Sequence, residues 1–428
     1  MSIASEIHRI KNCIAEAYTA CCDKRATMPQ TQNIRNLADT VRSIPQSGAA
    51  MLEKKDVNFC DYEGTVLYSY TFSEAAQLSV LPVLPEHTGL TAQGWTHTLS
   101  QIHTSVTKGY AVDVGATYTT SDGSSRFYIT IPTNRYLTVP LNFEFSASTG
   151  TVTVDWGDGT TTTETGSTSH TYSPASYPAN YVIKVTLISG ELTWQGNTTT
   201  NSSSVFGESK EYTTMLKKAE IGVGSIGTRA FNSCSALRSV VLSHTGTYIG
   251  AYAFYKCSAL KSVVIPYTVT FIGTCAFYDC CALRSVVIPH TVTSIGTYAF
   301  YNCSALTSVV LPGSLGSIDQ AVFNSCKSLA SLVIPDSIFS IGLFAFSYCD
   351  SLTSITIPAS VRSLATSWLS GPGFVMLDLT AFNGNIPYLE GSFSGYGVFA
   401  VKDQSMVDMF SSATNWSNYA EEYVIKDW

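Results

Sequence analysis

The chain carries few charges for its length. Only 13% of its 428 residues are Asp, Glu, Lys or Arg, and the formal net charge at pH 7 is −7. Proteins that bind nucleic acid through its phosphates gather basic residues on one surface, and this composition gives no electrostatic case for such a partner. Residues 226–363 are instead rich in Ser, Thr, Tyr and Val, which suits contacts with glycans or proteins.

Long apolar runs are also missing. A membrane-spanning helix needs about 20 mostly apolar residues, and no stretch approaches this length, so we expect no membrane insertion. Near the start of the chain Glu6, Arg9 and Lys11 interrupt the apolar positions, unlike the apolar core of a secretion signal. We therefore expect no secretion signal there.

Recognisable catalytic and metal-binding patterns are absent as well. The seven histidines include no H-E-x-x-H motif, and Asp155 and Asp158 lack the alternating oxygen ligands of a calcium loop. Residues 222–227 match G-x-G-x-x-G but open no long helix. We expect no enzyme, no cofactor and no metal, although a catalytic group assembled only in space leaves no mark in one sequence.

Two amphipathic helices are predicted in the first 50 residues. Ile3, Ile7, Ile10 and Ile14 recur at the spacing of one helix face, and residues 33–43 show a shorter pattern of the same kind that ends before Pro45. Two such faces cannot form a stable domain alone. We expect residues 1–50 to be an attachment segment whose helices pack on each other, on the next module or on another subunit.

A 23-residue unit repeats six times without insertion over residues 226–363, and it dominates the sequence. Each copy reads Ile-Gly-x-x-Ala-Phe-x-x-Cys-x-x-Leu-x-Ser-Val-x-Ile/Leu-Pro, with small departures. The six copies open at Ile226, Ile249, Ile272, Ile295, Ile318 and Ile341. A fixed period of this length predicts a solenoid, in which each unit buries its apolar face against its neighbours.

Within a unit, Leu260, Val263 and Ile265 have the L-x-x-L-x-L spacing of a leucine-rich repeat, and their β-branched neighbours predict a short strand. Pro266 then ends the strand, because proline cannot donate to a ladder. The unit resembles the BspA-like subfamily of leucine-rich repeats, which implies a binding or adhesion role. Leu216, Ala219 and Ile221 repeat the strand spacing once more and predict a degenerate first unit.

Half of the twelve cysteines occupy one column of the repeat. They are Cys234, Cys257, Cys280, Cys303, Cys326 and Cys349. A constant spacing of 23 residues is typical of a packing position, and the remaining cysteines form no C-x-x-C pair. We therefore expect free thiols and folding in a reducing cytoplasm.

Residues 152–160 read Val-Thr-Val-Asp-Trp-Gly-Asp-Gly-Thr, followed by His170-Thr-Tyr172 and a strand pattern from Tyr181. This order resembles a PKD-like β-sandwich, which implies a spacer or binding module. Gly157 and Gly159 are expected to supply positive φ in the hairpin, and the alternating apolar residues before them to face a core.

Residues 51–135 predict a small α+β module. Residues 56–64 and 65–70 predict a hairpin, Ser73 an N-cap, residues 89–95 and 121–125 turns, and residues 126–131 a strand. The chain also contains the runs Ile-Ala-Ser-Glu-Ile (3–7), Asp-Val-Asn-Phe-Cys-Asp-Tyr (56–62) and Gly-Leu-Thr-Ala-Gln-Gly-Trp (89–95). With these runs, the segment and the preceding helices resemble an N-terminal module of tail-fibre-like and other prophage-borne proteins of gut bacteria. The resemblance implies attachment to tail or baseplate proteins through residues 1–50.

The predicted fold class is multidomain and mainly β. The expected parts are a helical attachment segment (1–50), an α+β module (51–135), a PKD-like sandwich (136–195), a linker rich in Thr, Asn and Ser (196–215), the solenoid (216–371) and a C-terminal cap (372–428). A cap is needed because the last strand would otherwise expose an apolar edge.

Two sets of outward residues are candidate ligand-binding positions. Outward valines in five of the six strands predict a docking strip, although β-propensity alone also explains them. Tyrosines around Ala-Phe offer an apolar ring with a hydroxyl, although packing between neighbouring turns also explains Tyr255, Tyr278 and Tyr301. The candidates are Tyr252, Tyr255, Tyr298, Tyr301, Tyr348, Val264, Val287 and Val310.

The first hypothesis for function is a phage or prophage tail protein that recognises a host-cell glycan or protein and resides in the virion. The alternative is a BspA-like adhesin on a bacterial surface. A glycan-processing enzyme is the third hypothesis, and no residue pair supports it. Association into a homo-oligomer stays open for either of the first two.

Overall fold

The computed structural model describes residues 56–425, with gaps at residues 64, 108–111, 147–148, 197–203, 208–209, 372–373, 383–385, 391–395, 414, 417 and 419–422. The chain divides into two compact units, residues 1–55 and residues 56–428. The helices predicted in residues 1–50 lie outside the described residues. In the part that is described, no helix is both long and apolar enough to cross a membrane.

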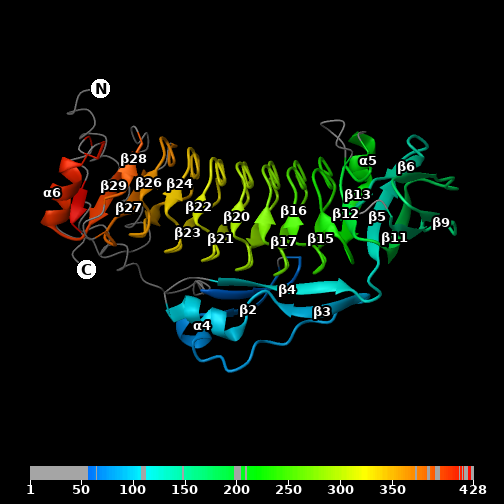
Figure 1. Cartoon of the computed structure of the whole chain (residues 1–428), viewed down its shortest axis with the longest axis horizontal. Helices are drawn as coiled ribbons and strands as arrows, with labels where there is room; N and C mark the ends of the chain where they lie inside the picture. Colours follow the sequence, from blue (N-terminus) through cyan, green and yellow to red (C-terminus); the bar gives the residue numbers. More distant parts are fainter. Residues whose placement is uncertain are drawn as a thin grey trace, which may run out of the picture. The chain divides into compact units, whose positions relative to one another are not determined.

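Two parallel ribbons of short strands form the solenoid (Figure 1). The first ribbon contains β13 (Leu216–Glu220), β15 (Ser239–Val241), β17 (Ser262–Val264), β19 (Ser285–Val287), β21 (Ser308–Val310), β23 (Ser331–Val333) and β25 (Ser354–Thr356). The second contains β14 (Ser225–Ile226), β16 (Tyr248–Ile249), β18 (Phe271–Ile272), β20 (Ser294–Ile295), β22 (Ser317–Ile318), β24 (Ser340–Ile341) and β26 (Ser363–Leu364). Equivalent residues pair in register, as Val263 does with Val286, which confirms the predicted repeat. The degenerate first unit is confirmed by the parallel pairing of β13 with β15.

The cysteine column packs in the interior as predicted, beside a column formed by the phenylalanine of each unit. The members of this Phe column are Phe231, Phe254, Phe277, Phe300, Phe323 and Phe346, and all are fully buried. Successive Phe rings stack with centroids between 5.1 and 5.8 Å apart. From Cys257 to Cys349, each Sγ of the column donates a hydrogen bond of 3.1 to 3.2 Å to the Phe carbonyl oxygen of the preceding unit. Burial raises the pKa of Cys234 and of Cys349 to about 12. The described cysteines are all free thiols, and the column is a packing position.

A β-sandwich whose strands lie in three sheets precedes the solenoid. Its strands are β5 (Ser125–Ile131), β6 (Thr138–Leu141), β7 (Glu144–Phe145), β8 (Thr151–Asp155), β9 (Thr161–Glu164), β10 (Thr168–Thr171), β11 (Ala179–Ser189) and β12 (Leu192–Trp194). Because β5 pairs with β13 and β12 pairs with β14, one sheet continues into each ribbon, and the two parts share a single hydrophobic core. Gly157 and Gly159 have the predicted positive φ. Trp156, between β8 and this turn, is fully buried.

Part of the predicted linker belongs to this core. Val205 and Phe206 are buried, and the ring of Phe206 packs on Phe127 with centroids 5.5 Å apart. The helix α5 (Lys210–Met215) follows. The linker prediction for residues 196–215 is therefore wrong for these described residues. Two apolar side chains within a polar stretch are enough to anchor this segment in the core.

An α+β module lies within residues 57–120, shorter than the predicted 51–135, because the strand predicted over residues 126–131 (β5) pairs with β11 and β13 in the sandwich. Its strands β1 (Val57–Cys60), β2 (Val66–Tyr70), β3 (Leu90–Trp95) and β4 (Val112–Thr120) lie in the order β2-β1-β4-β3, with helices α3 (Phe72–Ala75) and α4 (Leu99–Thr107). The β1–β2 hairpin is confirmed. The N-cap of α3 is Thr71, which forms a capping box with Glu74, and not Ser73. The turn predicted over residues 89–95 is largely strand, because Gly94 lies at an irregularity of the β3–β4 pairing rather than in a turn.

The ribbons continue beyond the sixth repeat. The first ribbon gains β27 (Phe374–Asp378), β29 (Tyr396–Val401) and β30 (Tyr423–Ile425), and the second gains β28 (Tyr388–Leu389). The helix α6 (Gln404–Ser412) packs beside β29 and β30. Trp416, which is buried, donates from Nε1 to the carbonyl oxygen of Pro387 at 2.8 Å. The segment predicted as a cap therefore consists of further rungs together with a closing helix.

Candidate functional site

The valine column is covered over the first half of the ribbon. Strand β4 lies along β15, β17, β19 and β21 (Figure 1), and Val241, Val264 and Val287 are only 3%, 6% and 4% exposed. The prediction that Val264 and Val287 belong to an exposed strip is wrong. The repeat pattern predicts that these side chains point away from the interior of the solenoid. It does not predict that another part of the chain packs on them.

The contact between module and ribbon is close. Tyr62, Ala116 and Tyr118 pack on Val241 and Val264, and the space left between them is about 10 Å³. A side chain at Gly115 would place its Cβ 2.6 Å from Cγ1 of Val264, so this approach requires glycine. Further along the same column Val310 is half-buried and Val333 is 39% exposed.

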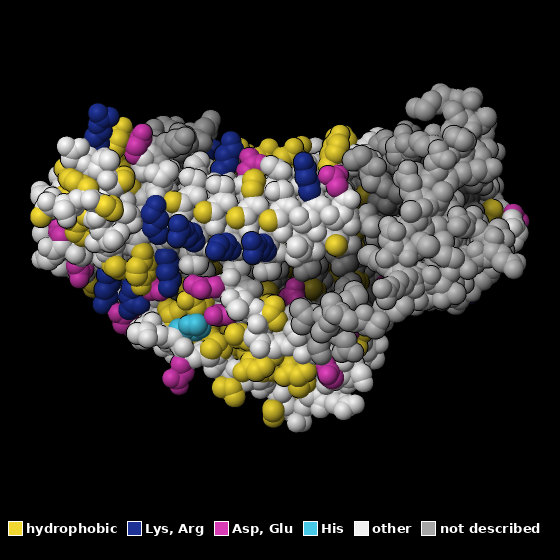
Figure 2. Space-filling model, turned by 180° about the vertical axis from the view of Figure 1, so that it is seen from behind, with side chains coloured by type: hydrophobic (Ala, Val, Ile, Leu, Met, Phe, Trp, Pro, Cys, Tyr) yellow, Lys and Arg dark blue, Asp and Glu magenta, His cyan; other side chains and the backbone are white. Residues whose placement is uncertain are grey.

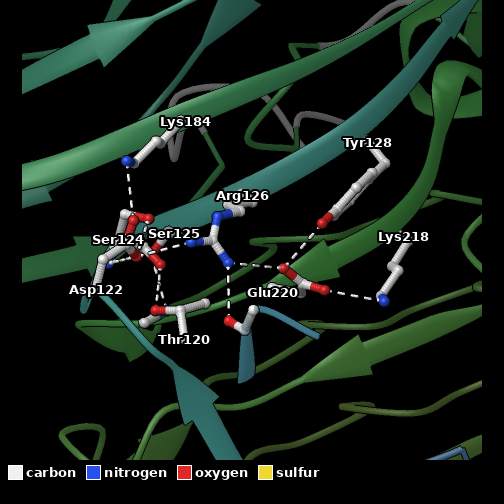
Figure 3. A network of polar contacts seen from close by, with 11 residues as sticks. Thr120, Asp122, Ser124, Ser125, Arg126, Tyr128, Lys184, Lys218 and Glu220 are labelled. Carbon is white, nitrogen blue, oxygen red and sulfur yellow. Dashed lines mark hydrogen bonds and ion pairs between the residues drawn. The ribbon is translucent and has the colours of Figure 1, made fainter. Parts of the chain in front are cut away.

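Charged residues hold the turn between module and sandwich. Asp122, in the β4–β5 turn, forms ion pairs with Arg126 at 2.8 Å and with Lys184 at 2.9 Å (Figure 3). Partial burial alone would raise the pKa of Asp122, but hydrogen bonds from Lys184 and Ser124 and the charge of Arg126 hold it well below its usual range. This turn therefore depends on an ionised Asp122.

The same network reaches the first strand of the solenoid. Glu220 of β13 is 3% exposed and accepts a hydrogen bond from Tyr128 at 3.0 Å and ion pairs from Lys218 at 2.9 Å and Arg126 at 3.4 Å (Figure 3). A buried carboxylate of this kind is retained only with such partners. Because each of these charges is paired, we interpret the network as a structural junction rather than a binding or catalytic site.

Five tyrosines from three consecutive units form a cluster at the turns after the second ribbon. Tyr278 stacks on Tyr255 and on Tyr301, with centroids 4.9 and 4.5 Å apart and planes inclined by 21° and 10°. Tyr252 packs on Tyr255 at 5.6 Å and Tyr298 on Tyr301 at 5.8 Å. All five are half-buried. The structure thus brings four of the predicted tyrosines together and adds Tyr278, which the sequence also marked as part of the column.

The geometry of this tyrosine cluster limits its chemistry. Both faces of the Tyr278 ring are occupied by neighbouring rings, so a sugar ring cannot stack on it, and the packing explanation of this column holds. Burial raises the pKa of Tyr278 to about 12, which keeps its hydroxyl protonated as donor and acceptor. Arg229 lies over the ring of Tyr252 at 5.1 Å and Lys256 over that of Tyr255 at 5.2 Å. The cluster therefore presents ring edges, hydroxyls and two cations.

The backbone of the repeat does not require tyrosine at these turns. Tyr252 and Tyr298 have φ of 58° and 59°, and other residue types adopt this conformation at the same position of neighbouring units. Those residues are Arg229, Cys275, Ala321, Phe344 and Ser367. Tyr348 is 51% exposed, but it occupies a different column two units further on and does not belong to the cluster.

One feature of the surface was missed by sequence reasoning. Arg238, Lys261 and Arg284 are separated by 23 residues each, and this spacing could have revealed a row of cations on successive rungs.

Among the described residues, no group of three or more His, Cys, Asp or Glu is placed to hold a metal.

The model of the BspA type leucine rich repeat region (6 copies) matches residues 189–283 and 270–381. These residues are BspA-type leucine-rich repeats. The match begins at residue 189, so the PKD-like and tail-fibre-like resemblances of the preceding residues stay predictions. No curated protein matches the chain.

Solved structures with similarity to part of the chain come from several bacteria. A leucine-rich repeat protein of Bacteroides ovatus is 30% identical with a TM-score of 0.39, over 42% of this chain and 48% of that protein. A Treponema (T. pallidum) leucine-rich repeat protein is 29% identical with a TM-score of 0.29, over 42% and 79%. A leucine-rich cell surface protein of Faecalibacterium prausnitzii is 28% identical with a TM-score of 0.26, over 36% and 56%. The chain thus spans about half the length of the first of these proteins.

Proposed function

We propose that the protein is a non-catalytic adhesin of a bacterial surface that binds a glycan or protein through the tyrosine cluster. The observation that carries this proposal is the gathering of five half-buried tyrosines from three units into one patch with two cations at one end. Tyrosine and arginine are enriched where protein surfaces bind partners. The BspA-type repeat supports the adhesin, as the family resemblance implies.

Whole-cell binding with a double variant tests the site. Replacing Tyr252 and Tyr298 by Ser removes the two outer rings, and Ser367 already adopts the same backbone conformation in a later unit. We expect affinity for cells, or for a spot on a printed glycan array, to fall about tenfold, since loss of central aromatic contacts costs roughly 1 to 2 kcal/mol. Phe344→Ser is the matched control, because it removes an exposed ring from the same column outside the cluster.

The outcomes separate the proposal from trivial explanations. Unchanged binding by a double variant that unfolds at the wild-type temperature would show that the cluster is packing only. Equal losses in the double variant and in Phe344→Ser would show a general loss of aromatic surface rather than a site.

The alternative, a phage tail protein, differs from the surface adhesin in where the protein resides and not in which surface binds the ligand. It depends on residues 1–50 as an attachment segment, which lie outside the described residues, and the BspA-type match supports the surface adhesin instead. Antibody labelling of intact cells and of purified virions distinguishes the two. Label on virions alone would overturn the adhesin in favour of the tail protein.

A further inference from the structure

A row of basic side chains runs along the first four rungs of the ribbon. It consists of Lys217, Arg238, Lys261 and Arg284, whose backbones are joined in sequence by hydrogen bonds of 3.0, 3.3 and 2.9 Å. Figure 2 shows Lys and Arg side chains in such a row across the repeats, on the side next to the α+β module. Successive rungs of a parallel ribbon are about 4.8 Å apart, so the row is a regular line of positive charge. We call it the basic row.

The basic row forms one wall of a groove of about 620 Å³. Glu63 and Thr65 of the module contribute to the opposite wall, and the hydroxyls of Ser239 and Ser285 line the groove beside the cations. Ser262 also lies there, but it is 3% exposed and donates to the carbonyl oxygen of Tyr62 at 3.4 Å. The groove exists because the module docks on the ribbon, and a solenoid without that module would present the same cations on an open face.

The solenoid does not need these charges. The same column holds Thr307, Ala330 and Thr353 in the next three units, so an uncharged residue satisfies the fold. Like charges on adjacent strands repel each other and destabilise a sheet. The basic row therefore carries a cost in folding that the structure itself does not explain.

Most of the basic row is unused within the protein. Arg238, Lys261 and Arg284 are exposed, and none of their side chains forms an ion pair with a residue that the structure describes. Lys217 is partly engaged, since its Nζ donates to the carbonyl oxygen of Thr214 at 2.8 Å. Three cations thus line the groove without an ion-pair partner in the described part of the chain.

We propose that this groove binds an extended anionic polysaccharide, which lies along the ribbon with its acid groups on the basic row. One pyranose ring is about as long as the distance between rungs, so successive sugars lie beside successive cations. An extended peptide advances by only about 3.4 Å per residue, so its residues do not match the spacing of the cations. Arginine binds carboxylate or sulfate through two parallel hydrogen bonds. The serine hydroxyls beside the row suit the hydroxyls of the sugar. This site is separate from the tyrosine cluster and does not rest on it.

Titration calorimetry of the full chain with oligogalacturonate tests the proposal. The variant Arg238→Thr/Lys261→Thr/Arg284→Thr uses the residue that Thr307 supplies in the same column, so folding is expected to be retained. We expect a loss of affinity of about tenfold or more, because three charge-assisted contacts are removed. Wild-type binding should also weaken as salt is raised to about 0.15 M, since exposed charges are screened. The control Lys327→Thr/Arg362→Thr/Lys402→Thr makes the same change of net charge outside the groove and should bind as wild type.

Three comparisons decide the chemistry. Methyl-esterified oligogalacturonate keeps the chain and removes the charge, and equal binding of both forms would overturn the proposal. Sulfated dextran distinguishes a sulfate ligand from a carboxylate one, and binding of either supports an anionic glycan. Preference for poly-glutamate over both polysaccharides, or equal losses in the two triple variants, would also overturn it. The Tyr252→Ser/Tyr298→Ser variant should bind oligogalacturonate normally, so this site and the proposed adhesive site fail independently.

Discussion

The two halves of the first ribbon are built from the same repeat but have different surroundings. In the covered half, Val264 and Val287 are 6% and 4% exposed beneath strand β4, whereas in the open half Val333 is 39% exposed. The column, the strand and the interior packing are alike in both halves. The difference shows that a repeat specifies which side chains point outward, while burial of an outward residue depends on the rest of the chain.

Charged substitutions at outward valines should show the largest difference in stability between the two halves. Val264→Asp places an unpaired carboxylate between module and ribbon, and we expect a loss of about 3 kcal/mol in the free energy of unfolding or release of the module. Val333→Asp at the same position of the open half should change stability by less than about 0.5 kcal/mol. Denaturant unfolding together with protection of β4 from proteolysis measures both. Equal losses would mean that the module does not cover the ribbon in solution.

This contact was beyond the reach of sequence reasoning. The Phe and Cys columns were predictable because six units repeat the same spacing, and the pairing of β13 follows from the same pattern at Leu216 and Ala219. No local signal links Gly115 to Val264, whose contact spans two different kinds of fold. Val205 and Phe206 were missed for a related reason, since two residues are too few to show a period.

A second comparison concerns glycines. Gly115→Val should displace the module, because its Cβ would lie 2.6 Å from Val264, and overpacking of this kind costs about 1 to 3 kcal/mol. Gly313 in the open half has no atom within 4 Å of an added Cβ and no positive φ, so Gly313→Val is the matched control with little expected effect. Thermal unfolding of the two variants checks this. A larger loss at Gly313 than at Gly115 would contradict the tight contact.

Lowering the pH should destabilise the covered half of the ribbon more than the open half. His97 of the module and His290 of the ribbon lie with ring centroids 6.4 Å apart, and burial, followed by the charge of His290, lowers the pKa of His97 to about 4. In the unfolded chain this pKa is about 6.5, so between these values only the unfolded chain binds the proton, and stability falls as pH decreases. We expect about 1 kcal/mol to be lost between pH 7 and pH 5.5 through this group.

Unfolding of His97→Gln at several pH values measures that contribution. The free energy of unfolding of the wild type should fall relative to that of the variant as pH is lowered. Proteolysis of β4 should detect release of the module under the same conditions. A constant difference across this range would show that His97 titrates alike in the folded and unfolded chain, and that the module does not bury it.

The interior should show no difference between the halves. Cys257 and Cys326 donate equivalent hydrogen bonds, of 3.1 and 3.2 Å, to Phe carbonyl oxygens. Cys257 lies in a unit of the covered half and Cys326 in a unit of the open half. Cys257→Ala and Cys326→Ala should each cost about 1 kcal/mol, through the lost hydrogen bond and a small cavity, and the two values should agree within about 0.5 kcal/mol. Chemical unfolding of the single variants tests this. A clearly larger loss at Cys257 would show that the module also tightens the packing beneath it, and that the two halves differ in their cores as well as on their surfaces.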